Sequence, residues 1–257
     1  MQNNNVKVID IYNYIDSIAP FSTAMDFDNV GLLVGDPNKT VNKILVTLDI
    51  IDGAVDKAKK YGAELIVSHH PVIFNPIKNV LSDSVVYSLC NKGISAICAH
   101  TNLDAASGGV NDILCEIIGL KNVEIWPPEN IGRIGYTDYD LHSFADIIVK
   151  NLDTSSVNLV DCGKRVKKVA VMSGSGGGDI DYAVAVGADT LLTGEMKHSQ
   201  YISAKNKGIN VIAAGHFDTE YIVVSPLSKK IATQFPSVDV SVYKEPSYKV
   251  IINNLKQ

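Results

Sequence analysis

Short apolar runs alternate with helical patterns along most of the chain. Six of these runs predict buried strands, at residues 43–48, 64–67, 94–99, 168–172, 190–192 and 210–214. Near-continuous apolar strands separated by helices are typical of largely parallel sheets that are covered on both faces. We therefore predict an α/β protein with mainly parallel sheets.

Apolar residues at helical spacing predict the elements between these strands. Helices are expected over 6–18, 51–61, 82–91, 109–118, 141–152, 180–186 and 199–207. Pro20, Gly62 and Gly93 mark helix ends, and Ser82 is placed to cap the start of the third helix. The stretch 24–35 has the pattern of a loop. The tail over 238–252 alternates enough to supply one more strand pair.

The chain is long enough to fold as two lobes, since it has 257 residues. The stretch 126–166 is less regular and carries Pro127-Pro128. We interpret it as the connection into a second lobe. The expected organisation is an N-terminal α/β lobe over 1–125 and a C-terminal α/β lobe over 126–257, which together form one functional unit.

Composition narrows the range of partners. The net charge of −5 and the pI near 5.6 give no general attraction to nucleic acid or to an anionic membrane, so neither is expected as a partner. The N-terminus does not have the pattern of a signal peptide, and no apolar run is long enough to span a bilayer. The four cysteines form no C-x-x-C pair. These features predict a reduced, cytoplasmic protein.

Imidazoles and carboxylates follow three of the predicted strands. The residues concerned are His69 and His70 after 64–67, His100 and Asp104 after 94–99, and His216 and Glu220 after 210–214. Ligands of parallel α/β sheets bind at the carboxyl ends of the strands, so these side chains are expected to gather in one place. His216 and Glu220 are four residues apart, and on a helix they would share a face.

This combination of ligand types indicates a metal site. Imidazole nitrogen and carboxylate oxygen suit zinc, iron(II), manganese or cobalt, and argue against calcium alone. A single histidine at one of these positions would most simply be a hydrogen-bonded core or loop residue. A cluster of ionisable groups, however, seldom occurs without a functional role. The predicted ligands are more than one tetrahedral ion needs, which indicates two divalent ions. These ligands are His69, His70, Asp104, His216 and Glu220.

Two further segments follow predicted strands. The stretch 173–179 is rich in glycine and reads either as a nest of N–H groups for a phosphate or another anion, or as a simple connection. No Gly-Lys-Ser/Thr follows, so it is not a Walker A loop. Glu195 and His198 come after the strand 190–192, where they line the pocket or lie on the surface.

Several short motifs resemble those of the Nif-three-like dinuclear-metal family, many of whose members are labelled GTP cyclohydrolase I type 2 homologues. The motifs are Ser68-His69-His70-Pro71, His100-Thr101-Asn102-Leu103-Asp104, Gly215-His216-x-x-x-Glu220, Asp28-Asn29-Val30-Gly31-Leu32 and Thr193-Gly194-Glu195. The resemblance runs from about residue 20 to 225. It matches the short form of the family, because 126–166 leaves no room for the extra domain of longer members.

The resemblance implies an arrangement and an activity. The five predicted ligands take the family's ligand positions, and His100 lies beside them, where it supports a ligand or handles protons. The implied fold has two lobes with the dinuclear metal site in the cleft between them, and the implied assembly is a ring-shaped homo-hexamer.

The leading functional hypothesis is a metal-dependent hydrolase of a nucleotide-like or phosphorylated small molecule, with GTP ring opening as the family label indicates. Catalytic proton transfer is assigned to His100 and Glu195. The alternative is a non-catalytic metal-binding or regulatory protein that forms a ring assembly. A metal with no open coordination position would favour this alternative. Nucleic-acid binding in the ring's central hole ranks last.

Overall fold

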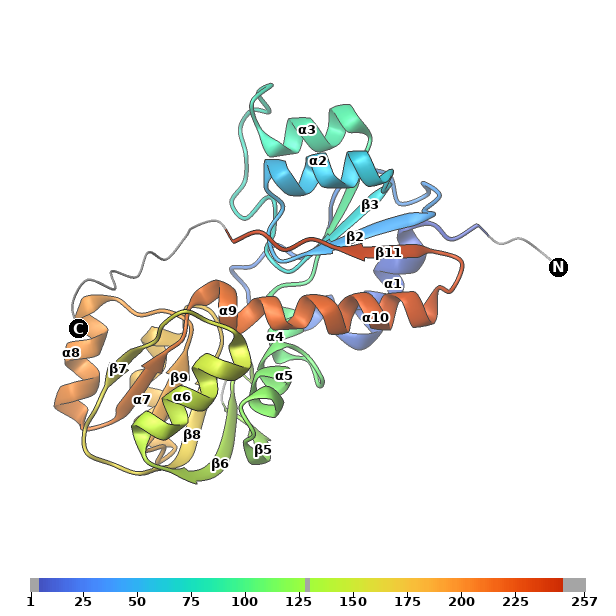
Figure 1. The fold of residues 1–257 in the computed structure, drawn as a ribbon. Coiled ribbons are helices and arrows are strands. Elements are labelled where there is room, and N and C mark those ends of the chain that lie inside the picture. The colour runs from blue at the N-terminus through green and yellow to red at the C-terminus, as the bar shows by residue number, and fades with distance from the viewer. Residues whose placement is uncertain (1–4, 128–129, 247–257) are drawn as a thin grey trace. The chain divides into compact units, whose positions relative to one another are not determined.

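The computed structural model describes residues 5–127 and 130–246, and these divide into two compact units (Figure 1). The first unit contains the described residues up to Gly109 together with Val223–Glu245. The second unit is Val110–Ile222. Each unit has its own sheet.

The observed boundaries differ from the expected division at residues 125 and 126. The chain leaves the first unit earlier, at Gly109, and returns to it at Val223. The return has a physical cause, because strand β11 (Asp239–Val242) pairs in parallel with β2 (Lys43–Thr47) and so completes the first sheet. Of the predicted C-terminal strand pair, residues 247–252 lie outside the described residues.

The sheet of the first unit has the strand order β1-β4-β3-β2-β11 among the described residues. Its other strands are β1 (Gly31–Val34), β3 (Leu65–Ser68) and β4 (Ser95–Cys98). Only β1 is antiparallel to its neighbour, β4. The prediction of a loop over 24–35 is wrong for the four residues of β1. They form a strand because they pair with β4.

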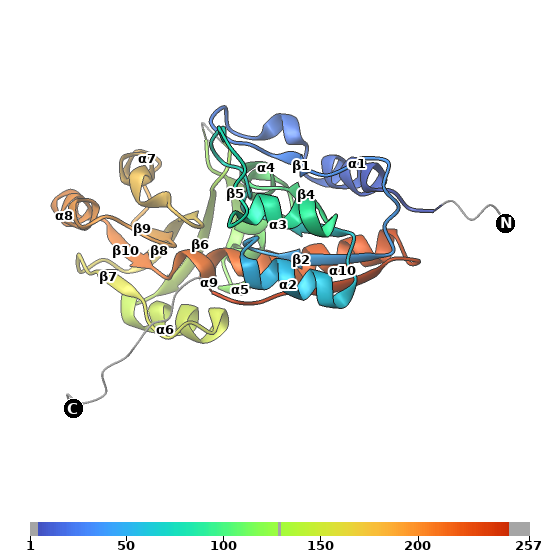
Figure 2. The same ribbon diagram turned by 90° about the horizontal axis from the view of Figure 1, so that it is seen from above.

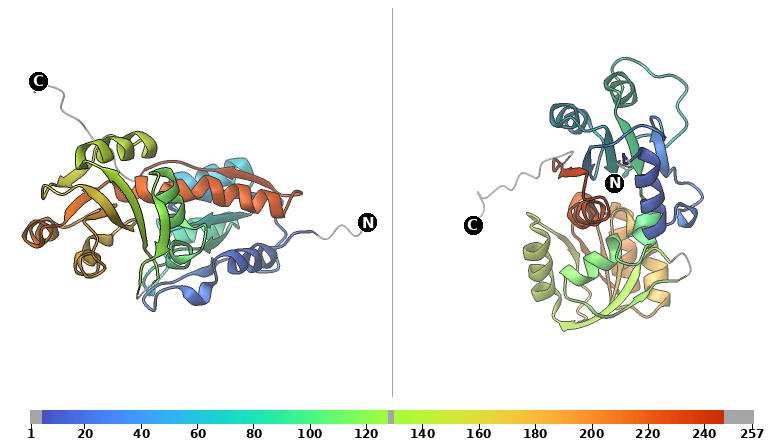
Figure 3. Two further views of the ribbon diagram at one scale, coloured as in Figure 1. Left: turned by 90° about the horizontal axis from the view of Figure 1, so that it is seen from below. Right: turned by 90° about the vertical axis from the view of Figure 1, so that its right-hand side faces the viewer.

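The helices of the first unit cover both faces of its sheet (Figures 1 and 3). They are α1 (Val8–Ile18), the short 3-10 helix η1 (Phe21–Thr23), α2 (Asp52–Tyr61), α3 (Val85–Lys92), α4 (Thr101–Ala105) and α10 (Val224–Gln234). Leu45 and Ile66 pack with Val55 of α2 in one core cluster. Their neighbours in sequence, Ile44 and Leu65, are also fully buried and point to the opposite face, because strand side chains alternate.

Helix ends in the first unit follow the expected signals, with one shift. Gly62 and Gly93 end α2 and α3 in the left-handed conformation, at φ values of 81° and 63°. Ser82 was expected to cap α3, but the helix starts later. The Ser84 hydroxyl accepts the capping hydrogen bond from the Tyr87 N–H at 3.2 Å.

The sheet of the second unit is mixed, with the order β5-β6-β8-β9-β10-β7 among the described residues. Its strands are β5 (Lys121–Ile125), β6 (Arg133–Tyr139), β7 (Asn158–Val160), β8 (Val166–Met172), β9 (Thr190–Thr193) and β10 (Asn210–Ala213). The pairs β8–β9 and β9–β10 are parallel, and the others are antiparallel. The three predicted strands form this parallel centre, and the strands that sequence reasoning missed surround it.

The second unit has three layers (Figure 2). Its helical elements are α5 (Val110–Ile117), α6 (Leu141–Leu152), η2 (Gly176–Asp179), α7 (Ile180–Ala185), α8 (His198–Lys207), α9 (His216–Glu220) and the start of η3 (Tyr221–Val223). Val171 and Leu192 pack with α5 and α6 on one face. Ala170 and Leu191 pack with α7 and α8 on the other. In neither unit is a described helix long and apolar enough to cross a membrane.

Candidate metal centre

Three histidine rings gather at the carboxyl edge of the first sheet. His69 and His70 follow β3, and His100 follows β4, which is the parallel neighbour of β3. The ring centroids lie 5.1 to 5.5 Å apart. One nitrogen from each ring lies within 4.8 Å of the others, so the three are able to hold a metal ion. His100, which was predicted beside the ligands, is thus part of this cluster.

A hydrogen bond at Nδ1 orients each of these three rings. The bonds are His69 to the Ala99 carbonyl at 2.9 Å, His70 to Asp49 Oδ1 at 2.7 Å and His100 to Asp28 Oδ1 at 2.8 Å. Since each partner is an acceptor, each Nδ1 carries the proton and the lone pair lies on Nε2. Histidine ligands of protein metal sites are held in the same way.

Asp28 is the anchor of this network. Its carboxylate also accepts hydrogen bonds from the Thr101 N–H at 3.0 Å and from the Thr101 hydroxyl at 2.5 Å. Burial by itself would raise the pKa of Asp28, but the bonds from His100 and Thr101 and the nearby imidazole outweigh it and lower the pKa. Asp28 is therefore a carboxylate at neutral pH, where it can fix the orientation of His100.

Asp104 joins the histidines from helix α4. The His100 carbonyl accepts hydrogen bonds from the N–H groups of Leu103 and Asp104, which closes the first turn of this helix directly after β4. The turn brings Asp104 Oδ1 to 3.6 Å from His69 Nε2. Asp104 is only 6% exposed. The first unit therefore brings together every site residue that the sequence predicted within it.

The second unit carries its own pair of predicted ligands on α9, after β10. His216 Nε2 lies 3.0 Å from Glu220 Oε2, as their spacing of four residues on a helix predicts. Glu195, which follows β9, places Oε1 3.1 Å from His216 Nδ1. Hence both nitrogens of His216 face carboxylates. His198 lies exposed at the start of α8.

The glycine-rich segment after β8 packs against this pair. Gly174 has φ +59°, and a Cβ atom there would lie 2.0 Å from Glu220 Oε1. The Gly174 N–H donates to the Thr219 hydroxyl at 3.1 Å, and the Gly176 N–H donates to the Thr193 hydroxyl at 2.9 Å. These N–H groups bind threonines of the same unit rather than facing an anion. The segment makes room for the Glu220 carboxylate, a role that its composition did not reveal.

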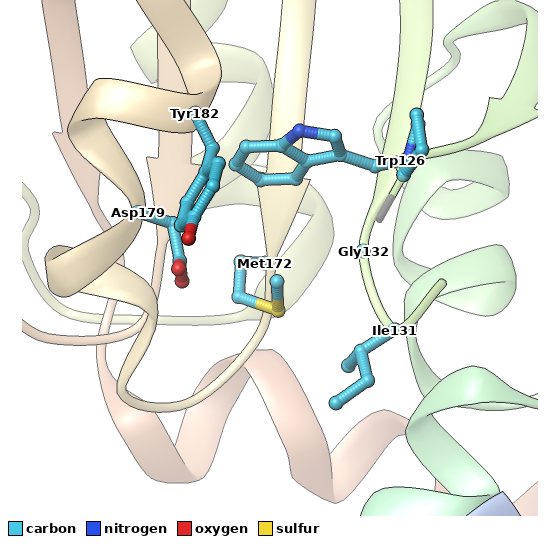
Figure 4. Close-up of a pocket in the computed structure, with 7 residues that line it drawn as sticks. Trp126, Ile131, Gly132, Met172, Asp179 and Tyr182 are labelled. Carbon is cyan, nitrogen blue, oxygen red and sulfur yellow. The ribbon is translucent and has the colours of Figure 1, made fainter. Parts of the chain in front are cut away.

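Two hollows of different character are found among the described residues of the second unit. Trp126, Met172 and Tyr182 line a small one with mainly apolar walls (Figure 4). The other is a cavity of about 360 Å³ beside His216 and Glu195. No histidine lines the first hollow, so the chemistry of this unit is concentrated at the second.

Sequence reasoning missed the residues that position the ligands. Asp49 comes two residues after the end of β2, and the same strand-end rule that found the histidines also applies to it. Asp28 lies in a motif that was recognised, but no predicted strand precedes it. Thr219 lies between two predicted ligands in the chain and is completely buried. Nothing in its type indicates that its hydroxyl bonds the glycine-rich segment.

A family model described as DUF34/NIF3 (NGG1p interacting factor 3) matches residues 6–248. The chain belongs to the DUF34/NIF3 family. A Clostridium perfringens protein named GTP cyclohydrolase 1 type 2 homolog is 34% identical over 254 residues, which cover 93% of this chain and 97% of the relative.

Solved structures share this fold over nearly the whole chain. The crystal structure of Staphylococcus aureus protein SA1388 has a TM-score of 0.90 and 28% identity, and the match covers 96% of this chain and 100% of that one. Reduced HcgD from Methanocaldococcus jannaschii has a TM-score of 0.83 and 30% identity, with 92% and 97% covered. The predicted α/β fold and the predicted family are both confirmed.

The predicted short form is also supported. A Staphylococcus aureus relative with the same GTP cyclohydrolase 1 type 2 homolog name is 25% identical over 357 aligned positions, more than the 257 residues of this chain. That relative therefore carries a segment that this chain does not have.

Proposed function

We propose that this protein is a metal-dependent hydrolase that acts on a nucleotide-like or phosphorylated small molecule. Its dinuclear centre would take His69, His70 and Asp104 from the first unit and His216 and Glu220 from the second. The observation that carries the proposal is the histidine cluster, in which three rings are held with their Nε2 lone pairs close together. Imidazole nitrogens so oriented, with the Asp104 carboxylate 3.6 Å from His69 Nε2, match the donor set of zinc, iron or manganese.

The surroundings of these residues also fit a metal centre. Carboxylate and carbonyl acceptors fix the Nδ1 tautomer in the first unit, and Glu195 contacts Nδ1 of His216 in the second. Gly174 leaves the space that the Glu220 carboxylate occupies. When bound, divalent ions would lower the pKa of a coordinated water and polarise substrate oxygens.

His100 and Glu195 are the proposed proton-transfer residues. Asp28 holds the proton of His100 on Nδ1, so Nε2 is the atom at which a proton can be received and returned. Glu195 uses Oε1 to orient His216, and its side chain is 57% exposed, within reach of a bound substrate. Its carboxylate can accept a proton from the attacking water and return it to the leaving group.

Metal stoichiometry and hydrolysis test this function separately. The chelator-stripped protein is loaded with zinc, iron(II) or manganese, and bound metal is counted by mass spectrometry. We expect two ions per chain, and fewer for His69→Ala and for His216→Ala. His142→Ala is the matched control, because this histidine of the second unit is 74% exposed and its ring faces Asp161, which is not a predicted ligand. Unchanged stoichiometry in both ligand variants would refute the metal assignment.

Activity is then measured on GTP and on a panel of nucleotides and phosphorylated small molecules. Turnover that requires metal and falls in His100→Ala supports a hydrolase. Two bound ions without turnover on any member of the panel would instead favour the non-catalytic metal-binding alternative. Under that alternative His216→Ala would disturb assembly.

We propose further that six copies form a ring. Large apolar side chains between β3 and α3 support association, because Phe74, Ile77, Val80 and Leu81 are each more than 40% exposed. Light scattering after size-exclusion chromatography measures the mass. A hexamer that dissociates in Leu81→Asp supports the ring, and a monomeric wild-type protein refutes it.

A further inference from the structure

Thr219 holds the start of helix α9, which carries both predicted ligands of the second unit. The side chain is completely buried. Its hydroxyl donates its one proton to the Gly215 carbonyl at 2.8 Å and to the His216 carbonyl at 3.0 Å. The same oxygen accepts the Gly174 N–H at 3.1 Å. Because a hydroxyl both donates and accepts, this one group joins α9 to the segment that follows β8.

Gly174 is bonded on its other side to the segment that follows β9. Its carbonyl accepts the Glu195 N–H at 2.8 Å and the Thr193 hydroxyl at 3.3 Å. Glu195 and Glu220 are the two carboxylates that face the ring nitrogens of His216. Gly174 therefore links the backbone of one carboxylate residue to the helix of the other, and the segments after β8, β9 and β10 meet at this residue.

Gly194 allows these segments to pack closely. A Cβ atom at this position would lie 2.5 Å from the Gly174 carbonyl oxygen and 2.7 Å from Thr219 Oγ1. It would also lie 2.8 Å from the His216 Cα. Two of these three atoms belong to the backbone and are unable to rotate away, so the close approach requires a glycine. The motif Thr193-Gly194-Glu195 thus contributes packing as well as a carboxylate.

We propose that Thr219 is a positioning residue, which fixes the directions of His216 and Glu220 although it is not itself a ligand. The Glu220 carboxylate lies directly against Gly174, because a Cβ atom there would come 2.0 Å from Oε1. A hydroxyl that holds Gly174 in place therefore also holds the surface that supports this carboxylate. The consequence for metal affinity rests on the proposed function, since metal sites tolerate ligand displacements of only about 0.2 Å.

Replacement of the hydroxyl tests this role. Thr219→Val has nearly the same shape but leaves the Gly174 N–H without its acceptor. In competition with a chromophoric chelator, we expect the zinc affinity of the full-length protein to fall about 10- to 100-fold, as for other residues that orient metal ligands. Thr219→Ser keeps the hydroxyl and should retain most of the wild-type affinity. Thr219→Ala also removes the hydroxyl and replaces the valine variant if that variant does not fold.

Thr190→Val is the matched control. Thr190 is also completely buried, and its hydroxyl donates to Asp189 Oδ1 at 2.8 Å and accepts from Asn210 Nδ2 at 3.4 Å. It starts β9, whereas Gly194 follows the end of that strand. Each valine variant loses the hydrogen bonds of one buried hydroxyl, so the two should show a similar decrease in Tm. Only Thr219→Val should also lose zinc affinity.

NMR of the metal-free protein gives a second measurement that does not depend on metal. The two ring nitrogens of His216 lie 3.1 Å and 3.0 Å from carboxylate oxygens, and their ¹⁵N chemical shifts report these contacts. Thr219→Val should change these shifts and speed the hydrogen exchange of the Gly174 amide. The serine variant and the matched control should leave both properties as in the wild type.

Three outcomes would overturn the proposal. They are equal zinc affinity in Thr219→Val and Thr190→Val, equal losses in the valine and serine variants of Thr219, and unchanged His216 ring signals in Thr219→Val. A wild-type protein that binds no zinc would instead contradict the proposed metal centre, and the NMR comparison would then decide the role of Thr219 by itself. The positioning role and the proposed function therefore fail by different results.

Discussion

Gly174→Ala is expected to separate metal binding from folding stability. A Cβ atom at this position would lie 2.0 Å from Glu220 Oε1, whereas ordinary contact begins at 3.4 Å. The carboxylate oxygen must therefore move by about 1.4 Å, the difference between these distances. Metal sites tolerate ligand displacements of only about 0.2 Å. Changing a residue that only supports a metal ligand already lowers metal affinity about 10- to 100-fold. We therefore expect a displacement of the ligand itself to lower the affinity at least about tenfold.

The expected loss of stability in Gly174→Ala is modest. A left-handed φ of +59° costs a residue with a Cβ atom about 1–2 kcal/mol. The displaced atom is the far end of a flexible side chain, so moving it adds little to this cost. For a chain of this size, 1–2 kcal/mol corresponds to a decrease in Tm of roughly 2–8 °C.

Two glycines of the same unit serve as matched controls. Gly163 has φ +73° with nothing within 4 Å of the added Cβ, so Gly163→Ala isolates the backbone cost. Gly178 also has open space and does not have a left-handed φ, so Gly178→Ala should change neither property. Scanning calorimetry measures Tm, and competition with a chromophoric chelator measures zinc affinity. If Gly174→Ala binds zinc as tightly as Gly163→Ala does, the argument that links Gly174, Glu220 and the metal is refuted.

Three further predictions concern the first unit. Asp49→Asn weakens the 2.7 Å bond that orients His70, so zinc affinity should fall about 10- to 100-fold in the same competition assay while the fold persists. Asp28 has a folded pKa below its unfolded value of about 3.9, so its contribution to stability is present above that pH and lost below it. Calorimetry should therefore show that the Tm of Asp28→Asn depends less on pH between about pH 5 and pH 2. Ser84→Ala should cost about 1 kcal/mol in urea unfolding through loss of the cap, and Ser82→Ala less than about 0.5 kcal/mol.

Each of these predictions has an outcome that would contradict it. For Asp49, the control is Asp56→Asn, whose side chain is 73% exposed in an ion pair with Lys92; equal metal affinity in both variants would show that the His70 bond has no effect on binding. A pH profile for Asp28→Asn that is parallel to that of the wild type would mean that other groups cause the acid sensitivity. If Ser84→Ala and Ser82→Ala lowered the free energy of unfolding equally, Ser84 would not be the residue that caps α3.

The sequence by itself determined the strongly patterned parts of this protein. The strands β2, β3 and β4 and the parallel centre β8, β9 and β10 are short apolar runs buried on both faces, and burial of that kind leaves a clear pattern. The same runs predicted which residues stand at strand ends. His69, His70, His100 and Asp104 therefore came together at one edge as expected, because parallel neighbours end side by side.

Only the tertiary structure decided the weaker elements and the supports of the site. β1 is a strand because β4 offers it hydrogen-bonding partners, which no local pattern encodes. The alternation of the tail predicted a strand at β11, but only the structure shows that β11 pairs with β2. The unit boundary follows from the same long-range pairing. Asp28 and Asp49 are distant in sequence from the rings they hold, and a hydrogen bond between distant residues leaves no periodic signal. The ligands belong to strand ends, which sequence reveals, whereas the groups that orient them come from wherever the fold brings an acceptor within about 3 Å.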